Sequence, residues 1–402
     1  MNFWRNVRQL LKNKRIFSHV FLSVHLNGSF PKVFVHPHFY NLATLFKFAA
    51  IVGLMEPHKK LRTTSKAKYD TIIDSKAQQY LNALKVRWMQ LHEMPGLFAY
   101  QLREERLKRQ LPGRYGFHVE LNADRSLKRR APQIIDNLNP KFKPQQFNFN
   151  KVDGQEVLLI IDDLKDKCEI QMIINKSPLT KYHTLICPDV KKNLVQRVTL
   201  KSLAFCINFL RNIEEPNMRM GYNSPGALAS VNHLHFHLLD MPQELYIDKV
   251  NLQEIAGGYA YRLNKESPTE AVCFVVQAKD DEQQVLEKVQ NIHKLTEWLC
   301  NNKLPHNMFI TQQKNSNDLR VFVFVRDKFC VSKDVTAFNV GFCELAGFIP
   351  LSDEDKVKNL TEQKVIERIR SVTGNAYDAV YDQVQHIVNG TDQSLWQQPF
   401  TL

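Results

Sequence analysis

The feature that most constrains this chain is a run of three histidines spaced two residues apart, His233, His235 and His237. Apolar residues separate and follow them. Successive side chains of a β-strand point to opposite faces, so this alternation predicts one face of imidazoles and one apolar face. We therefore expect residues 229–239 to form a strand that is anchored in a core by its apolar face and presents the histidines as a rigid row.

Three roles are open to such a row. Imidazole nitrogen is a good zinc ligand, but no nearby Cys, Asp or Glu obviously completes a coordination shell. A purely structural role, in which the histidines only satisfy hydrogen bonds, is the second. The third is nucleophilic catalysis, because neutral imidazole can attack phosphorus and form a phosphoramidate that is then passed on. We favour this third role, because the preceding loop offers Gly226 and Ser230 for binding phosphate.

The order of predicted elements is similar in the two halves of the chain. In the first half a helix is predicted over 192–211, and strands over 147–152, 156–161, 168–174 and 184–187. In the second half a helix is predicted over 283–301, and strands over 271–277, 308–311, 321–325 and 338–345. This order predicts an α+β fold made of two related halves.

We divide the chain accordingly. Residues 1–65 are predicted to be a basic, poorly ordered extension. Residues 66–260 are predicted to form the catalytic unit. Residues 261–402 are predicted to form a second, degenerate unit that ends in helices and has no counterpart of the histidine run.

Charge and hydropathy bear on the partners. The 402 residues carry a formal charge of +13, and residues 1–55 hold seven of the basic residues and no Asp or Glu, so the remainder carries +6. That balance suits a small polyanionic substrate as well as a nucleic acid, and no aromatic–basic recognition motif is present. The apolar stretch 41–54 is short and contains Lys47. We therefore expect neither a nucleic-acid nor a membrane partner.

The cysteines and the amino terminus bear on location. The seven cysteines are scattered and include no Cys-x-x-Cys pair, which fits a reducing compartment and a cytoplasmic location. Residues 3–15 mix apolar and basic side chains without acids, as mitochondrial presequences do. A mitochondrial location is therefore the alternative if residues 1–60 act as a presequence.

The histidine run resembles the signature of the histidine-triad superfamily, His–apolar–His–apolar–His–apolar–apolar. Its context, residues 221–235, is similar to the GDP-hexose phosphorylases, a family that includes plant GDP-L-galactose and animal GDP-D-glucose enzymes. Further segments resemble motifs of that family: residues 113–117, 125–130, 147–152, 175–179, 337–340 and 343–347. The plant branch has Gln where this chain has His237, so the animal branch fits better.

The resemblance implies a fold like that of galactose-1-phosphate uridylyltransferase, with antiparallel sheets and flanking helices. It implies that His235 becomes guanylylated, and that His233 and His237 orient it or bind phosphate oxygens. Further substrate contacts are implied for three polar residues, each with a turn or strand-start role as the alternative: Asn223, Ser230 and Asn175.

Two other features receive weaker roles. The histidine-triad superfamily usually has Gly at the position of Tyr182, which weakens the case for the adjacent His183. The basic run 128–130 could bind a diphosphate, but the favoured interpretation is a solvated loop.

The implied reaction is phosphorolysis of GDP-D-glucose to GDP and glucose 1-phosphate. Its partners are a GDP-hexose and inorganic phosphate, and no cofactor or metal is required. The alternatives are a histidine-triad hydrolase, a hexose 1-phosphate uridylyltransferase, and a non-catalytic nucleotide- or RNA-binding protein. Histidine-triad proteins are often dimers, so two arrangements stay open, a homodimer and a pairing of the two halves within one chain.

Overall fold

The computed structural model separates residues 1–68 from residues 69–402 as two compact units. In the first unit it describes two strands, β1 (Leu22–His25) and β2 (Lys32–Val35), which pair antiparallel. In the second unit it describes residues 76–163, 168–263, 266–332, 338–374 and 377–391. The rest of the predicted extension 1–65 lies outside the described residues, so its poor order stays a prediction.

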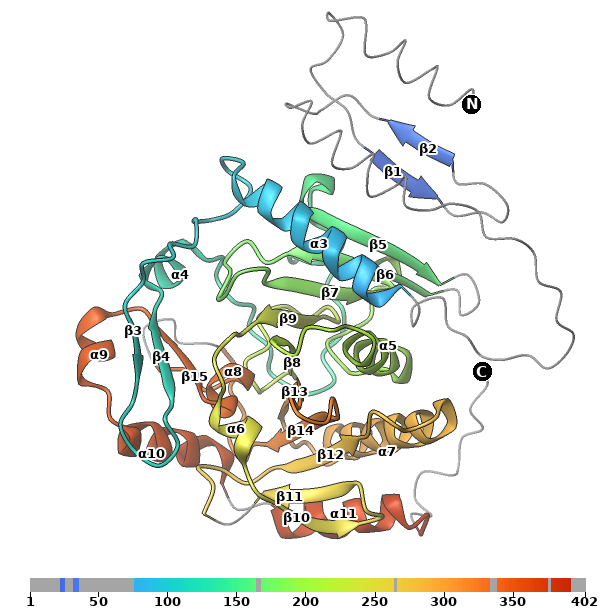
Figure 1. The fold of residues 1–402 in the computed structure, drawn as a ribbon, viewed down its shortest axis with the longest axis vertical. Coiled ribbons are helices and arrows are strands. Elements are labelled where there is room, and N and C mark those ends of the chain that lie inside the picture. The colour runs from blue at the N-terminus through green and yellow to red at the C-terminus, as the bar shows by residue number, and fades with distance from the viewer. Residues whose placement is uncertain are drawn as a thin grey trace, which may run out of the picture. The chain divides into compact units, whose positions relative to one another are not determined.

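A large antiparallel sheet is the centre of the second unit (Figure 1). From one edge to the other its ten strands are β10 (Leu252–Ala256), β11 (Ala260–Leu263), β12 (Val272–Val276), β14 (Leu319–Val325), β13 (His306–Gln312), β8 (Met218–Asn223), β9 (Phe236–Asp240), β7 (Thr184–Pro188), β6 (Cys168–Ile174) and β5 (Val157–Asp163). This confirms the predicted α+β class with an antiparallel sheet and helices.

The strands are arranged in the same sequence of connections on both sides of the central pair, β8 and β13. One side continues through β9, β7, β6 and β5, and the other through β14, β12, β11 and β10. The sheet therefore runs without a break across the predicted unit boundary, because β11 contains both Ala260 and Tyr261. The boundary itself stays a prediction.

Helices cover one face of the sheet: α3 (Ala77–His92), α5 (Leu200–Arg211), α7 (Glu282–Asn301) and α11 (Tyr377–Val388) (Figure 1). The helix predicted over 192–211 begins only at Leu200. Thr199 caps it, its side chain accepting a hydrogen bond from the Ser202 N–H while Ser202 binds the Thr199 N–H in return. Asn193, with a left-handed backbone, ends a short 3₁₀ turn before it. Capping thus sets the start of the helix.

The other face packs on a smaller layer. Its three-stranded sheet has the order β15 (Phe348–Leu351), β4 (His118–Leu121) and β3 (Lys108–Gln110), with β15 and β4 parallel. Short helices complete the layer: α4 (Ala123–Lys128), α6 (Tyr246–Lys249), α8 (Phe342–Ala346), α9 (Glu354–Asn359) and α10 (Glu362–Thr373).

The large sheet is buried on both sides because each face has its own core. In β14, Val321 and Val323 pack toward the helices, whereas Phe322 and Phe324 pack toward the smaller layer. Alternate residues of a strand reach opposite faces, so a strand with two covered faces is apolar throughout. In the described part of the chain, no helix is long and apolar enough to cross a membrane.

Two strand predictions were wrong. Residues 147–152 contain a 3₁₀ turn, Phe149–Lys151, because the Asn148 side chain accepts a hydrogen bond from the Asn150 N–H and turns the chain. Residues 338–345 lead into α8, where the Glu344 carboxylate accepts a hydrogen bond from the Gly341 N–H. In both segments a local side-chain bond competes with strand pairing.

Candidate active site

The histidine run lies where the chain enters the large sheet. Strand β9 begins at Phe236, so only His237 is part of the regular ladder, and the prediction of one strand over 229–239 was wrong in its extent. Leu234, Phe236 and Leu238 are fully buried in the core below the helices, as the alternation predicts. The apolar side of the run therefore anchors the segment although His235 precedes the strand.

His235 is held in one tautomer. Its Nδ1 lies 2.8 Å from the carbonyl oxygen of His233. A carbonyl oxygen can only accept, so Nδ1 carries the proton and donates, which leaves the lone pair of the neutral ring on Nε2. The His235 side chain is 3% exposed yet lines a cleft of this unit. The arrangement presents a nucleophilic nitrogen in a sheltered position.

Gln196 fixes the backbone of His235. Its Oε1 accepts a hydrogen bond from the His235 N–H at 2.9 Å, and its Nε2 donates to the His235 carbonyl at 3.1 Å. The same Nε2 donates to the carbonyl of Asn223 at 3.0 Å. Since the ladders of β9 with β7 and β8 end at Phe236 and His237, the buried carboxamide replaces a neighbouring strand for His235.

A second chain of hydrogen bonds sets the tautomer of His237. The Leu179 N–H donates to His183 Nδ1 at 2.9 Å, so the proton of the neutral His183 ring is on Nε2. That Nε2 lies 3.0 Å from His237 Nδ1 and donates to it. Burial, with a smaller effect of the Arg125 charge, holds the pKa of His183 well below its usual value. His237 Nε2 therefore carries a proton and is a donor.

His233 has a different position from its two neighbours. It does not line the cleft but is fully buried behind it. Its Nδ1 accepts a hydrogen bond from the Phe149 N–H at 3.0 Å, and its ring stacks on that of Phe149. Burial lowers the pKa of His233 to about 4, so the ring is neutral at pH 7. The geometry favours support of His235 over direct contact with a substrate.

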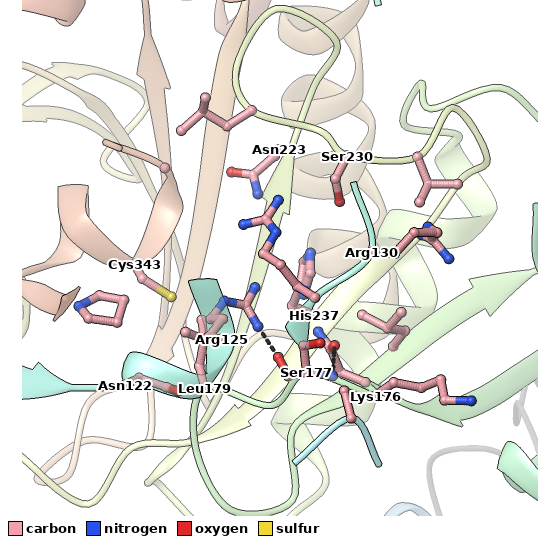
Figure 2. A pocket seen from close by; sticks show the side chains of 18 of the residues that line it. Asn122, Arg125, Arg130, Lys176, Ser177, Leu179, Asn223, Ser230, His237 and Cys343 are labelled. Atoms are coloured by element: carbon pink, nitrogen blue, oxygen red, sulfur yellow. Dashed lines mark hydrogen bonds between the residues drawn. The ribbon is translucent and has the colours of Figure 1, made fainter. Parts of the chain in front are cut away.

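The cleft has a volume of about 500 Å³ and a basic wall. Arg125, Arg129, Arg130 and Lys176 line it, and Figure 2 shows Arg125, Arg130 and Lys176 around the same opening as His237. Burial lowers the pKa of Arg129 to about 10, which leaves it charged at pH 7. All three residues of the basic run 128–130 line the cleft, and Lys128 and Arg130 are also exposed to solvent. The prediction of a solvated segment is therefore not contradicted, and contact with a diphosphate stays a prediction.

The predicted contact residues also line the cleft: Asn223, Ser230 and Asn175. The Asn223 amide is oriented, because its Oδ1 accepts hydrogen bonds from Asn307 Nδ2 at 2.6 Å and from the Phe342 N–H at 3.2 Å. Its Nδ2 is then the donor presented to the cleft (Figure 2). Asn175 Oδ1 accepts a hydrogen bond from the Ser177 N–H. Its Nδ2 lies 3.1 Å from His183 Nε2, but both atoms are donors in the tautomer that Leu179 sets, so this contact is not a hydrogen bond.

These groups together suit an anionic phosphorus centre. A neutral imidazole with its lone pair on Nε2 stands beside oriented donors from His237 and Asn223 and a wall of cations. Donors fixed before reaction stabilise developing negative charge without having to reorganise. Among the described residues, no group of three His, Cys, Asp or Glu side chains lies close enough to hold a metal ion.

Sequence analysis assigned one of these residues a weak role and the other none. His183 was given a weak role because the residue before it is Tyr182, but Tyr182 itself adopts the left-handed conformation, with φ of +58°, that glycine normally takes. Tyr182 packs against Trp88. Gln196 lies in a stretch that was predicted to be helical. Its contact with His235 spans 39 residues and has no local signal.

The fold is shared with a solved Ap4A phosphorylase. The solved yeast Ap4A phosphorylase Apa2 in complex with Ap4A aligns with 75% of this chain and 98% of its own, at a TM-score of 0.53 and 18% identity. At that identity the likeness concerns the fold.

Sequence comparison gives the family. Residues 79–239 match the GDPGP1-like N-terminal domain and residues 268–390 the GDPGP1-like C-terminal domain. GDP-D-glucose phosphorylase 1 of Homo sapiens is 33% identical over 304 residues, covering 72% of this chain and 78% of the human protein. GDP-L-galactose phosphorylase 1 of Arabidopsis thaliana is 27% identical over 318 residues, covering 71% and 70%. The chain belongs to the GDP-hexose phosphorylase family.

Proposed function

We propose that the chain catalyses the phosphorolysis of GDP-D-glucose to GDP and glucose 1-phosphate. The observation that carries the proposal is the tautomer of His235, which places a lone pair on Nε2 beside the basic cleft. Family membership supplies the class of substrate, since its relatives are named as GDP-D-glucose and GDP-L-galactose phosphorylases.

The reaction has two transfers at the phosphorus attached to guanosine. In the first, His235 Nε2 attacks that phosphorus, the bond to the bridging oxygen breaks, and glucose 1-phosphate leaves. In the second, an oxygen of inorganic phosphate attacks the guanylyl-histidine, the phosphorus–nitrogen bond breaks, and GDP leaves. His235 is therefore the nucleophile of the first step and the leaving group of the second, as in other covalent mechanisms.

The other cleft residues have supporting roles in this scheme. His237 Nε2 and Asn223 Nδ2 donate to the non-bridging oxygens of the transferred phosphoryl group, and Ser230 and Asn175 contact the substrate. Arg125 and Arg129 balance the charge of the diphosphate and attract the second anion. Arg125 is also bonded to the carbonyl of Ser177, which limits its movement. His233 supports the nucleophile from behind.

The test is a coupled assay of GDP and glucose 1-phosphate release from GDP-glucose, with and without inorganic phosphate. The proposal expects turnover only when phosphate is present, with both products in equal amounts. Turnover without phosphate, giving GMP, would establish the hydrolase alternative instead. UDP-glucose with a hexose 1-phosphate tests the uridylyltransferase, and salt-sensitive RNA binding without turnover tests the binding protein.

Three broader expectations accompany this function. We propose that the two halves of the large sheet are related, and the matching order of their strands supports it. We propose a cytoplasmic location, or a mitochondrial one if residues 1–60 are a presequence. None of the described cysteines forms a disulfide bond, which fits a reducing compartment. A homodimer stays a prediction, which sedimentation of the purified chain would test.

A further inference from the structure

One end of the cleft is apolar and begins at the nucleophile. The Phe149 ring contacts the His235 ring edge-on, with centroids 5.2 Å apart. Phe149 belongs to a small core with Ile173, and Val152 and Leu185 pack beside it. These four apolar side chains also line the cleft. A flat aromatic ligand would find contact surface here, next to the reacting phosphorus.

A carboxylate and a cation lie together at this end. Glu156, which closes the 3₁₀ turn Gly154–Glu156, is 9% exposed, and its Oε1 lies 3.2 Å from Lys176 Nζ. No other bond of the Glu156 carboxylate to a described residue is found, so Oε2 can take a second donor. Glu344 is the other carboxylate lining the cleft, and it already accepts the Gly341 N–H.

We propose that Glu156 and Lys176 read the edge of the guanine base, which rests on the proposed function and adds its base specificity. Guanine presents the N1–H and the 2-amino group as two neighbouring donors, with the O6 acceptor beside them. A carboxylate accepts both donors, and an adjacent ammonium donates to O6. Adenine presents an acceptor at N1 and a donor at its 6-amino group, so the same pair of side chains opposes it.

In this proposal Glu156 contacts N1–H and the 2-amino group, and Lys176 contacts O6. The two roles can therefore be tested separately. Hypoxanthine keeps N1–H and O6 but lacks the 2-amino group. Discrimination between GDP and IDP therefore depends on Glu156 alone, whereas discrimination between GDP and ADP depends on Glu156 and Lys176 together. A pair with only a structural role would produce neither pattern.

The experiment measures binding of GDP, IDP and ADP by calorimetry to the full chain carrying His235→Asn, which prevents transfer to the nucleophile. In that background GDP should bind at least tenfold more tightly than ADP, and more tightly than IDP. Adding Glu156→Gln should lower the GDP-to-ADP ratio at least tenfold and bring the GDP-to-IDP ratio close to one, because a carboxamide offers only one accepting oxygen. Adding Lys176→Met should lower the GDP-to-ADP ratio but leave the GDP-to-IDP ratio unchanged.

A matched control is Glu354→Gln, which breaks an ion pair with Lys358 on α9 outside the cleft and should change neither ratio. Thermal melting of each variant reports its fold. If Glu156→Gln melts early, the exposed Lys176→Met still tests the inference. Unchanged ratios in both variants would overturn it, as would a background with no preference for GDP over ADP. A preference for GDP in the His235→Asn chain, together with no phosphorolysis of GDP-glucose by the chain that retains His235, would contradict the proposed function alone.

Discussion

His183 Nε2 lies 3.0 Å from Nδ1 of His237, and both rings are held by contacts that leave one arrangement of protons. The relationship links the loop before β7 to β9, residues 54 positions apart. The contact makes His237 Nε2 a hydrogen-bond donor that faces the cleft. A residue outside the histidine run therefore sets the tautomer of one histidine within it.

Replacement of His183 by Asn should lower kcat about tenfold to a hundredfold, with little change in KM. The reason is that His237 loses its tautomer partner but keeps its place, and a single misplaced donor costs about that much. Steady-state kinetics with GDP-glucose and phosphate checks this. An unchanged kcat in a variant with normal circular dichroism would show that the contact has no catalytic effect.

Asn223→Asp should reduce kcat/KM by at least about a hundredfold. The accepting oxygen that Asn307 and Phe342 hold is retained, but a carboxylate oxygen replaces the donor that faces the substrate phosphate. The melting temperature should change little, because both held bonds remain available. Activity close to that of the parent would mean that Asn223 does not meet the phosphoryl group.

Gln196→Ala should lower kcat more than it raises KM. The change frees both backbone groups of His235 and leaves a buried N–H and carbonyl unsatisfied, so a loss of about 1–3 kcal/mol in unfolding free energy is also expected. Urea unfolding and kinetics on the same preparation measure both effects. Gln196→Glu keeps the volume but puts a carboxylate oxygen against the carbonyls of His235 and Asn223, so kcat should fall at least as far as in Gln196→Ala. Recovery of activity in Gln196→Glu would argue that Gln196 acts only through packing.

Acid should destabilise the chain between about pH 6.5 and pH 4. Burial lowers the pKa values of His233 and His306 to about 4 and holds the pKa of His183 well below its usual value, so in this window the unfolded chain binds protons that the folded chain does not. Stability therefore rises with pH, each such histidine adding at most about 1.4 kcal/mol per pH unit.

Urea unfolding at pH 5 and pH 7 measures this difference. His306 lies outside the cleft lining, and His306→Phe should reduce the difference because one titrating group is gone. Equal unfolding free energies at the two pH values would contradict the assignment of these histidines as neutral in the folded chain.

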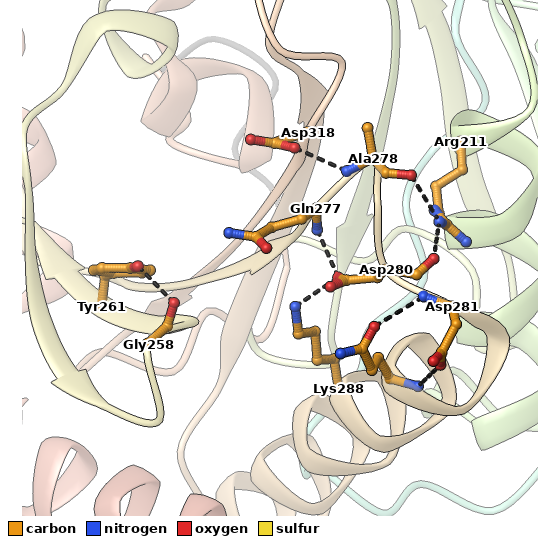
Figure 3. Close-up of polar contacts among 10 residues, drawn as sticks. Arg211, Gly258, Tyr261, Gln277, Ala278, Asp280, Asp281, Lys288 and Asp318 are labelled. Carbon is orange, nitrogen blue, oxygen red and sulfur yellow. Dashed lines mark hydrogen bonds and ion pairs between the residues drawn. The ribbon is translucent and has the colours of Figure 1, made fainter.

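Helices and buried side chains were predicted from the sequence where the pattern that indicates them lies within one segment. Helical spacing located α7 to within one residue, and Figure 3 shows how its start is built: Asp281 caps the helix, and Lys288 pairs with the buried Asp280 at 2.5 Å. The alternation around His235 likewise predicted which side chains are buried. Both signals arise from periodicities within one segment.

The remaining features depend on contacts between distant segments. Nothing near Gln196 in the sequence indicates that its carboxamide will replace a strand partner for His235. The run 128–130 reads as a polar loop, and only the packing of neighbouring segments turns Arg129 toward the cleft. Tyr182 illustrates the same limit, because tertiary packing on Trp88 accompanies a backbone conformation that residue type alone disfavours.

The central claim is that His235 carries the guanylyl group, and intact-protein mass after brief incubation with GDP-glucose without phosphate tests it most directly. We expect an added mass of one guanylyl group (GMP less water), absent from His235→Asn and discharged to GDP when phosphate is added. An adduct that persists in His235→Asn, or GDP-glucose phosphorolysis that continues in that variant, would contradict the account.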